Sequence, residues 1–114
     1  MAGALQPPDE TGVVPLRIDR PPVAHGIVSQ ALLTAPGLRA TLFRFAAGQE
    51  LSEHTSTARV LVQVIAGRCE FTADGRQYLL QPGELLHLPP HRPHAVRAVE
   101  DLTLLVLQAM PPKT

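Results

Sequence analysis

The sequence has little of what stabilises small secreted domains or marks nucleic-acid binding. It contains one cysteine, Cys69, so no disulfide can form within the chain. It has no tryptophan and only 4% aromatic residues, whereas base-stacking surfaces need exposed aromatic side chains. Lys plus Arg equals Asp plus Glu, at ten each, and this balance disfavours nucleic acid or an anionic membrane as the main partner. We therefore expect no nucleic acid and no membrane among the partners.

Long apolar runs are also absent. No stretch approaches the roughly 20 residues of a membrane-spanning helix. Residues 1–10 lack the basic start and apolar run of a signal peptide. Together with the lone cysteine, which we interpret as a small buried strand residue rather than a nucleophile, these absences predict a cytoplasmic protein.

Proline, in contrast, is plentiful, at 12 residues or about twice the ordinary frequency. Five prolines precede residue 23 and two lie at the end of the chain, which predicts an extended or loosely ordered segment over residues 1–22. The chain of 114 residues has the size of one domain, which we place at residues 23–110.

Short β-type runs separated by turn signals follow from about residue 26. Asp74-Gly75 predicts a tight hairpin with positive φ at both residues, and Gln81-Pro82-Gly83 predicts a turn with positive φ at Gly83. No window of a dozen residues keeps a helical period with caps at both ends. This pattern predicts an all-β sandwich or barrel. The predicted strands are 26–34, 38–46, 59–66, 68–73, 76–81, 84–88, 94–99 and 101–109.

Two of these strands contain almost wholly apolar runs, at 60–65 and 102–107. Such runs are typical of strands buried on both faces. We therefore expect one face to contact a second sheet or a second subunit.

Five histidines are the residues most able to carry chemistry. A lone histidine is usually a surface or turn residue, which is our interpretation of His25. His91 follows Pro90 at a turn position that needs positive φ, so we interpret it as a turn residue. His87 lies in an apolar strand, where a structural and a functional role are both open. The remaining two, His54 and His94, gain meaning from their surroundings.

His54 and His94 lie in two spaced patterns. The first consists of Gly48, five residues, His54, Thr55, Ser56 and a strand that ends at Gly67; the second consists of Gly83, five residues, Pro89, His91, His94 and Ala98. They resemble the two motifs of the cupin family, G-x5-H-x-H-x3-4-E-x6-G and G-x5-P-x-G-x2-H-x3-N. The resemblance covers about residues 38–109, with the Asp74-Gly75 hairpin between the motifs.

The resemblance implies an RmlC-like double-stranded β-helix, or jelly-roll barrel, that is often a homodimer and has its site inside the barrel. Carried over by position, His54 and His94 are metal ligands of the family. Ser56 replaces the second histidine of the first motif and Val60 replaces its glutamate. In the second motif, His91 stands for the glycine and Ala98 for the asparagine. Two of four family ligands are therefore retained.

Two imidazoles suit a divalent transition metal such as Zn, Fe, Ni, Cu or Mn, but most such sites need a third protein ligand. The candidates are Gln63, His87 and Glu53. Strand alternation places Gln63 on the face opposite Val60, so a glutamine at a subunit interface is the alternative interpretation.

Three functions remain open. The first is a small-molecule-binding protein with a degenerate metal site and no assignable reaction, its pocket containing Ser56, Val60 and His87 beside the two histidines. The second is a metal-dependent enzyme of the dioxygenase, isomerase or lyase type that uses His54 and His94. The third is a free-standing regulatory sensor. The sequence has no G-x-S-x-G, Gly-rich phosphate loop, H-E-x-x-H or C-x-x-C motif to indicate another chemistry.

Overall fold

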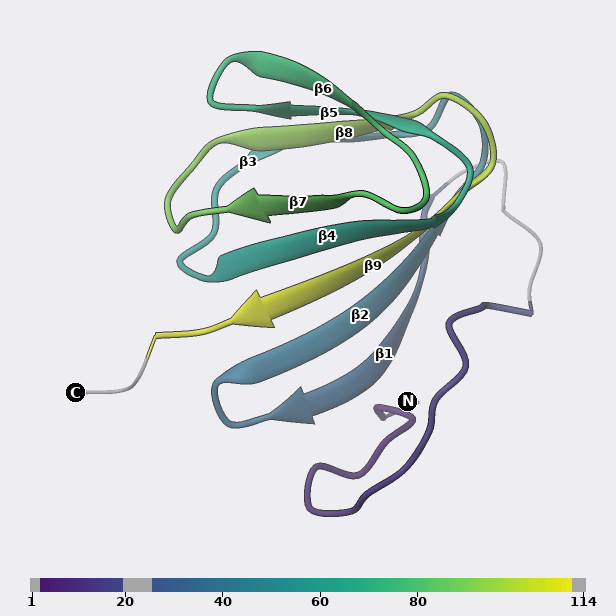
Figure 1. The fold of residues 1–114 in the computed structure, drawn as a ribbon, viewed down its shortest axis with the longest axis vertical. Coiled ribbons are helices and arrows are strands. Elements are labelled where there is room, and N and C mark those ends of the chain that lie inside the picture. Colours follow the sequence, from purple (N-terminus) through teal and green to yellow (C-terminus); the bar gives the residue numbers. More distant parts are fainter. Residues whose placement is uncertain (1–2, 20–25, 112–114) are drawn as a thin grey trace.

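Turns divide the chain into short antiparallel strands that form two opposed sheets (Figure 1). The computed structural model describes residues 3–19 and 26–111, and this part of the chain is all β, as predicted. Its strands are β1 (Val28–Ala35), β2 (Leu38–Phe45), β3 (Glu50–His54), β4 (Arg59–Ala66), β5 (Cys69–Ala73), β6 (Arg76–Leu80), β7 (Leu85–Leu88), β8 (His94–Ala98) and β9 (Leu102–Ala109). The larger sheet has the order β1-β2-β9-β4-β7 and the smaller one β3-β8-β5-β6. This is a jelly roll.

Eight of these strands match the predicted ones to within two residues at each end, whereas β3 was missed. All five residues of β3 are exposed, so the segment shows no alternation of buried and exposed positions. It lies at the edge of the smaller sheet and pairs only with β8, with a shift of register between Leu51 and His54. Pairing with β8 therefore makes this segment a strand, and its own side chains do not reveal it.

The turn chemistry agrees with the sequence. Asp74 and Gly75 both have positive φ, at 54° and 75°, and Gly83 has a φ of 94°. His91 has a φ of 65°, which confirms its interpretation as a turn residue. These left-handed residues reverse the chain between strands at little cost, because Gly, Asp and His tolerate that region better than other residues.

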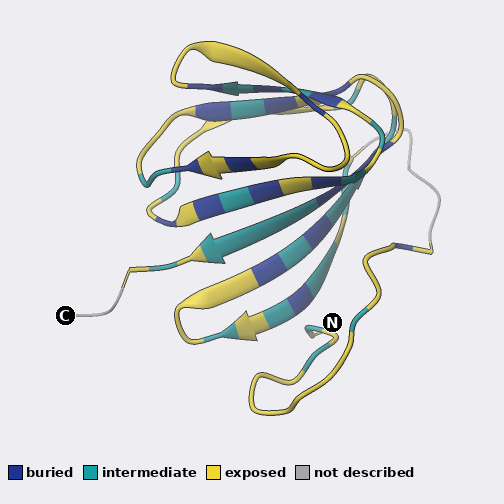
Figure 2. Cartoon of the chain, viewed as in Figure 1, coloured by how far each residue is buried: buried dark blue, intermediate teal, exposed yellow. Residues whose placement is uncertain are grey.

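The main core lies between the two sheets. In β4, Val60, Val62 and Val64 point inward and are buried, while the residues between them are exposed or half-buried; Figure 2 shows this banding along the strands. Phe45 and Leu104 pack against them from the same sheet, and the smaller sheet closes the core from above. Burying each such side chain contributes roughly 1.5–3 kcal/mol, so this layer fixes the separation of the sheets.

The outer face of the larger sheet carries a second apolar cluster, which contains Leu32, Leu42 and half-buried Leu105 and Leu107. Ile18 and Val14 of the N-terminal segment pack on it. The prediction of strands buried on both faces is therefore met only in part within one chain.

The segment of residues 3–19 forms no strand of its own but is attached to β1. The Leu5 and Gln6 amides donate to the carbonyls of Ala31 and Leu32, at 3.1 and 2.9 Å. Residues 1–2 and 20–22 of the predicted segment 1–22 lie outside the described residues, and so does His25. Within the described ranges, no helix is long and apolar enough to cross a membrane.

Candidate functional site

A cavity of about 300 Å³ lies between the two sheets. Most of its wall is apolar, and its polar groups are two imidazoles, two hydroxyls and one carboxamide. The lining residues are Phe43, Phe45, Leu51, His54, Thr55, Ser56, Val60, Val62, Phe71, His94, Val96, Leu104, Val106 and Gln108. A mostly apolar hollow with a few polar groups is typical of small-molecule sites, and this volume is at the lower end of their range.

Strand pairing brings His54 and His94 together, because they are direct partners in the β3–β8 ladder. Their ring centroids are 4.1 Å apart at an interplanar angle of 58°. The ring of His94 also stacks on Phe71, with centroids 5.9 Å apart and planes within 4°. His94 is buried, at 8% exposed, while His54 is exposed at the rim. The pair therefore extends from the interior of the barrel to solvent.

Backbone carbonyls determine the tautomer of both rings. Nδ1 of His54 lies 2.8 Å from the Ser52 carbonyl oxygen, and Nδ1 of His94 lies 2.9 Å from that of Arg92. A carbonyl oxygen only accepts, so we assign the proton of each neutral ring to Nδ1. The lone pair of Nε2 is then free on both rings. Such a backbone contact is also what orients histidines that bind metals.

The protonation of His94 is shifted as well. Burial lowers its pKa from 6.5; the contact with the Arg92 carbonyl opposes this shift and the nearby His54 adds to it. The ring is therefore neutral near pH 7 and its Nε2 accepts a hydrogen bond.

Ser56 and Val60 occupy the cavity wall at the two positions where the family motif has ligands. Val60 is buried and has no ligating atom. The Oγ of Ser56 accepts a hydrogen bond from the Ala58 amide at 3.1 Å, which leaves its proton for another partner. The Ser56 carbonyl accepts from the His91 amide at 2.8 Å, and this contact joins the β3–β4 and β7–β8 loops.

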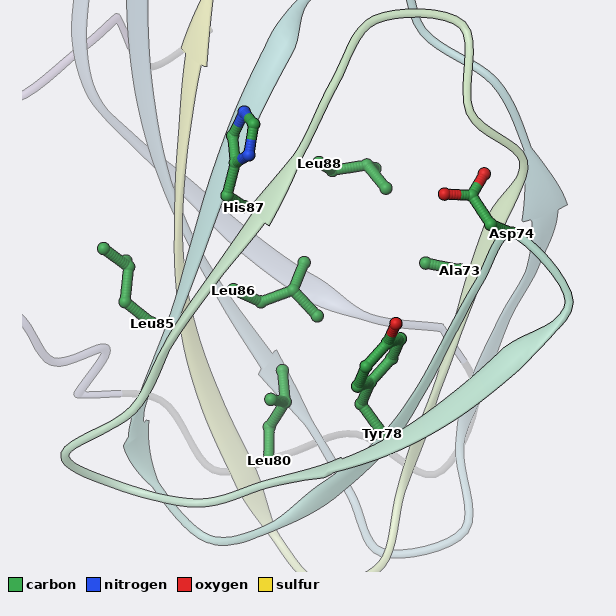
Figure 3. Close-up of a pocket in the computed structure, with 8 residues that line it drawn as sticks. All are labelled: Ala73, Asp74, Tyr78, Leu80, Leu85, Leu86, His87 and Leu88. Atoms are coloured by element: carbon green, nitrogen blue, oxygen red, sulfur yellow. The ribbon is translucent and has the colours of Figure 1, made fainter.

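The prediction that His87 belongs to this pocket is wrong. Neighbouring residues of a strand point to opposite faces, and the inward ones on β7 are Leu86 and Leu88. His87 is exposed, and its Nε2 accepts a hydrogen bond from Nη1 of Arg59 at 2.7 Å. It lines a separate hollow of about 260 Å³ at the edges of β6 and β7, which also contains Tyr78 and Asp74 (Figure 3).

The other candidate third ligands also lie outside the cavity. Gln63 is exposed on the outer face of β4, opposite to Val60, as strand alternation predicts. Glu53 is exposed and lies along a groove on the smaller sheet, together with Glu50 and Glu70. The geometry brings neither residue to the histidine pair.

The donor set is therefore incomplete for a tight metal site. Across residues 3–19 and 26–111, no three His, Cys, Asp or Glu side chains converge as metal ligands do. His54 and His94 supply two donors, whereas most transition-metal sites in proteins use three or more.

Sequence reasoning missed Gln108. Leu102 and Leu104 of β9 are buried in the core, so the inward phase of that strand continues through Val106 to Gln108. Gln108 is the direct cross-strand partner of Val60, beside the position of the family's glutamate. The sequence did contain a signal for this residue, because Gln108 is polar and lies near the end of a strand at a position whose side chain points inward.

Comparison with known proteins is consistent with this architecture. Residues 41–109 match the family model described as "Cupin domain". No curated protein matches the sequence. Among solved structures, a conserved protein of unknown function from Streptococcus pyogenes is 27% identical, with a TM-score of 0.79 and 92% of each chain covered.

Two further structures illustrate the range of these similarities. A cupin superfamily protein from Desulfitobacterium hafniense is 24% identical, with a TM-score of 0.75, and 82% of this chain and 84% of that chain are covered. A DMSP lyase from Ruegeria pomeroyi is 25% identical, with a TM-score of 0.70, and 77% of this chain and 49% of that chain are covered.

Proposed function

The chain belongs to the cupin family, and we propose that it binds a small organic molecule inside the barrel, at His54 and His94, without a dedicated metal ion. The observation that carries this proposal is the histidine pair itself. Two imidazoles with free Nε2 atoms, their ring centroids 4.1 Å apart, lie in an apolar cavity where no third His, Cys, Asp or Glu lines the wall. Such a site suits hydrogen bonding to a ligand better than tight metal coordination.

A thermal-shift screen followed by calorimetry tests this proposal. A ligand present at 100 times its Kd stabilises the fold by about 2.7 kcal/mol, which raises Tm by several degrees in a chain of this size. We expect at least one uncharged metabolite-sized compound to do so, and His94→Gln to remove the effect. His87→Gln is the matched control, because His87 lies outside the cavity and should leave binding unchanged. A broad screen in which no compound raises Tm would contradict the proposal.

A metal-dependent enzyme is the second candidate, and the histidine tautomers favour it. Nδ1 of each ring is engaged by a carbonyl, which leaves Nε2 directed as in metal-binding histidines. The similarity to a DMSP lyase is compatible with a lyase-type activity. Elemental analysis of untagged protein, purified without chelator and dialysed, distinguishes the candidates. Near-stoichiometric metal that disappears in His94→Ala supports the enzyme, and metal-free protein supports the binding function.

We also propose that the protein is a homodimer that uses the outer face of the larger sheet. Leu61, Ile65, Leu105 and Leu107 are only half-buried on this face, and Leu85 at its edge is 62% exposed. Covering this apolar surface would account for the apolar runs in β4 and β9. Light scattering after size exclusion tests the proposal, and a mass near 12.3 kDa at micromolar concentration would rule out the dimer.

A further inference from the structure

We infer that Gln108 selects the ligand of the cavity, and that this ligand is an uncharged ring compound bearing a hydroxyl or amide group. The inference rests on the proposed small-molecule function and deepens it. It assigns a role to the one carboxamide in the cavity wall.

Gln108 is placed to contact whatever His54 and His94 bind. It lines the same cavity as both histidines and is the cross-strand partner of Val60. Its side-chain amide makes no hydrogen bond to any residue in the described part of the chain. A carboxamide has two donor hydrogens and an acceptor oxygen, and those of the half-buried Gln108 are not among the buried polar atoms that lack a partner in the described residues. They are therefore available to an amide or hydroxyl group of a ligand.

The charges of the wall determine the charge of the ligand. No Asp, Glu, Lys or Arg is among the residues that line the cavity. Burying an ionised group without an opposite charge is strongly unfavourable. Arg39, the cross-strand partner of Gln108 on β2, carries a permanent charge and is exposed outside the lining. A carboxylate that reaches Arg39 is therefore the competing ligand, and the experiment must include one.

The histidines and phenylalanines indicate two further properties of the ligand, a hydrogen-bond donor and a ring. Both Nε2 atoms accept hydrogen bonds, because both Nδ1 atoms are engaged by carbonyls, so the ligand must donate. Phe43, Phe45 and Phe71 supply flat apolar walls that favour a ring. A volume of about 300 Å³ suits a single ring.

Calorimetry with five single-ring probes tests this inference: benzamide, phenol, benzoate, benzylamine and toluene. We expect benzamide and phenol to bind at least about tenfold more tightly than the two charged probes, a factor that corresponds to one good hydrogen bond or one uncompensated charge. Gln108→Leu should weaken benzamide binding about fivefold or more and leave toluene unchanged. Gln63→Leu is the matched control, because it makes the same change on the outer face of β4 and should alter neither.

Each outcome decides a separate point. If benzoate binds as tightly as benzamide, the cavity takes an anion and the uncharged ligand is wrong, while the proposed function stands. If Gln108→Leu binds benzamide like the unmodified protein, the assignment of Gln108 is wrong; Gln108→Met replaces this variant should it fail to fold. Binding of none of the five probes overturns the inference, whereas the wider screen described above decides the proposed function independently.

Discussion

The two faces of strands β4 and β9 have opposite roles, although they share one backbone. On the inner face, Val62 and Leu104 are buried and form the floor of the cavity. On the outer face, Leu105 is half-buried and Gln63 is exposed. Near the end of β9 the inner face becomes polar, because Gln108 lines the cavity there. Consecutive residues of one strand therefore lie in different environments. One faces the core or the cavity, and the next faces the surface that is available to a partner subunit.

The largest expected difference between the faces is in stability. Leu104→Ala removes a buried side chain and leaves a cavity, so we expect it to lower the free energy of unfolding by about 2–5 kcal/mol. Leu105→Ala affects a half-buried side chain and should cost about 1 kcal/mol in the monomer. Urea titration of both variants measures the difference. Equal losses at low protein concentration would show that the outer face is as well packed as the inner one.

Restoring the family ligands should convert the inner face into a metal site. The double variant Ser56→His, Val60→Glu adds an imidazole and a carboxylate to His54 and His94, so we expect near-stoichiometric Zn²⁺ or Ni²⁺ after dialysis. At 100 times its Kd, the metal should stabilise the variant by about 2.7 kcal/mol.

Ser56→His with Leu61→Glu is the control for this gain, because it adds the carboxylate to the outer face of β4. With three imidazoles but no carboxylate in the cavity, it should bind metal more weakly than Ser56→His, Val60→Glu. Equal metal affinity of the two double variants would mean that Val60 does not lie where the family's glutamate lies.

Changes on the outer face should affect dimer formation but not the stability of the single folded chain. Leu85→Glu places a charge on a side chain that is 62% exposed, so we expect less than about 0.5 kcal/mol of change in monomer stability. If the outer face joins two subunits, the same change should shift the mass measured by light scattering to that of one chain. A variant that keeps the mass of the unmodified dimer would place the contact elsewhere.

Cys69 extends the comparison to the smaller sheet. It points inward from β5 and is fully buried, and burial raises its pKa from 9.0 to about 11. At pH 8 its thiolate fraction should be about a hundredfold lower than that of an ordinary thiol, so alkylation by iodoacetamide should be slow until guanidinium unfolds the chain. Because the native state holds this proton more tightly, the contribution of Cys69 to stability should be complete below pH 9 and decrease as pH rises toward 11. Rapid alkylation of the folded protein would show that β5 opens locally.

The sequence predicts the fold well because turns and apolar alternation are local signals. Asp74-Gly75 and Gly83 have the backbone angles that their residue types indicate, and eight strands lie where alternation places them. The segment Glu50–His54 is different, since its strand state depends on pairing with β8. No local pattern records a pairing made with a segment about 40 residues away.

The candidate site was less predictable, because it depends on which face each residue occupies. The motif spacing identified His54 and His94, and the structure brings them together. His87 was predicted to be a pocket residue, but a shift of one residue along β7 places it outside the cavity. Gln108 was overlooked because the near-continuous apolar run before it hides the inward phase of β9.

The hydrogen bond from the His91 amide to the Ser56 carbonyl, 2.8 Å long, has a mechanical consequence. The β3–β4 and β7–β8 loops each cross from one sheet to the other, at the same end of the barrel (Figure 1). One loop starts at His54 and the other ends at His94. The bond therefore ties together the two loops that adjoin His54 and His94, and it restrains how far these loops can separate.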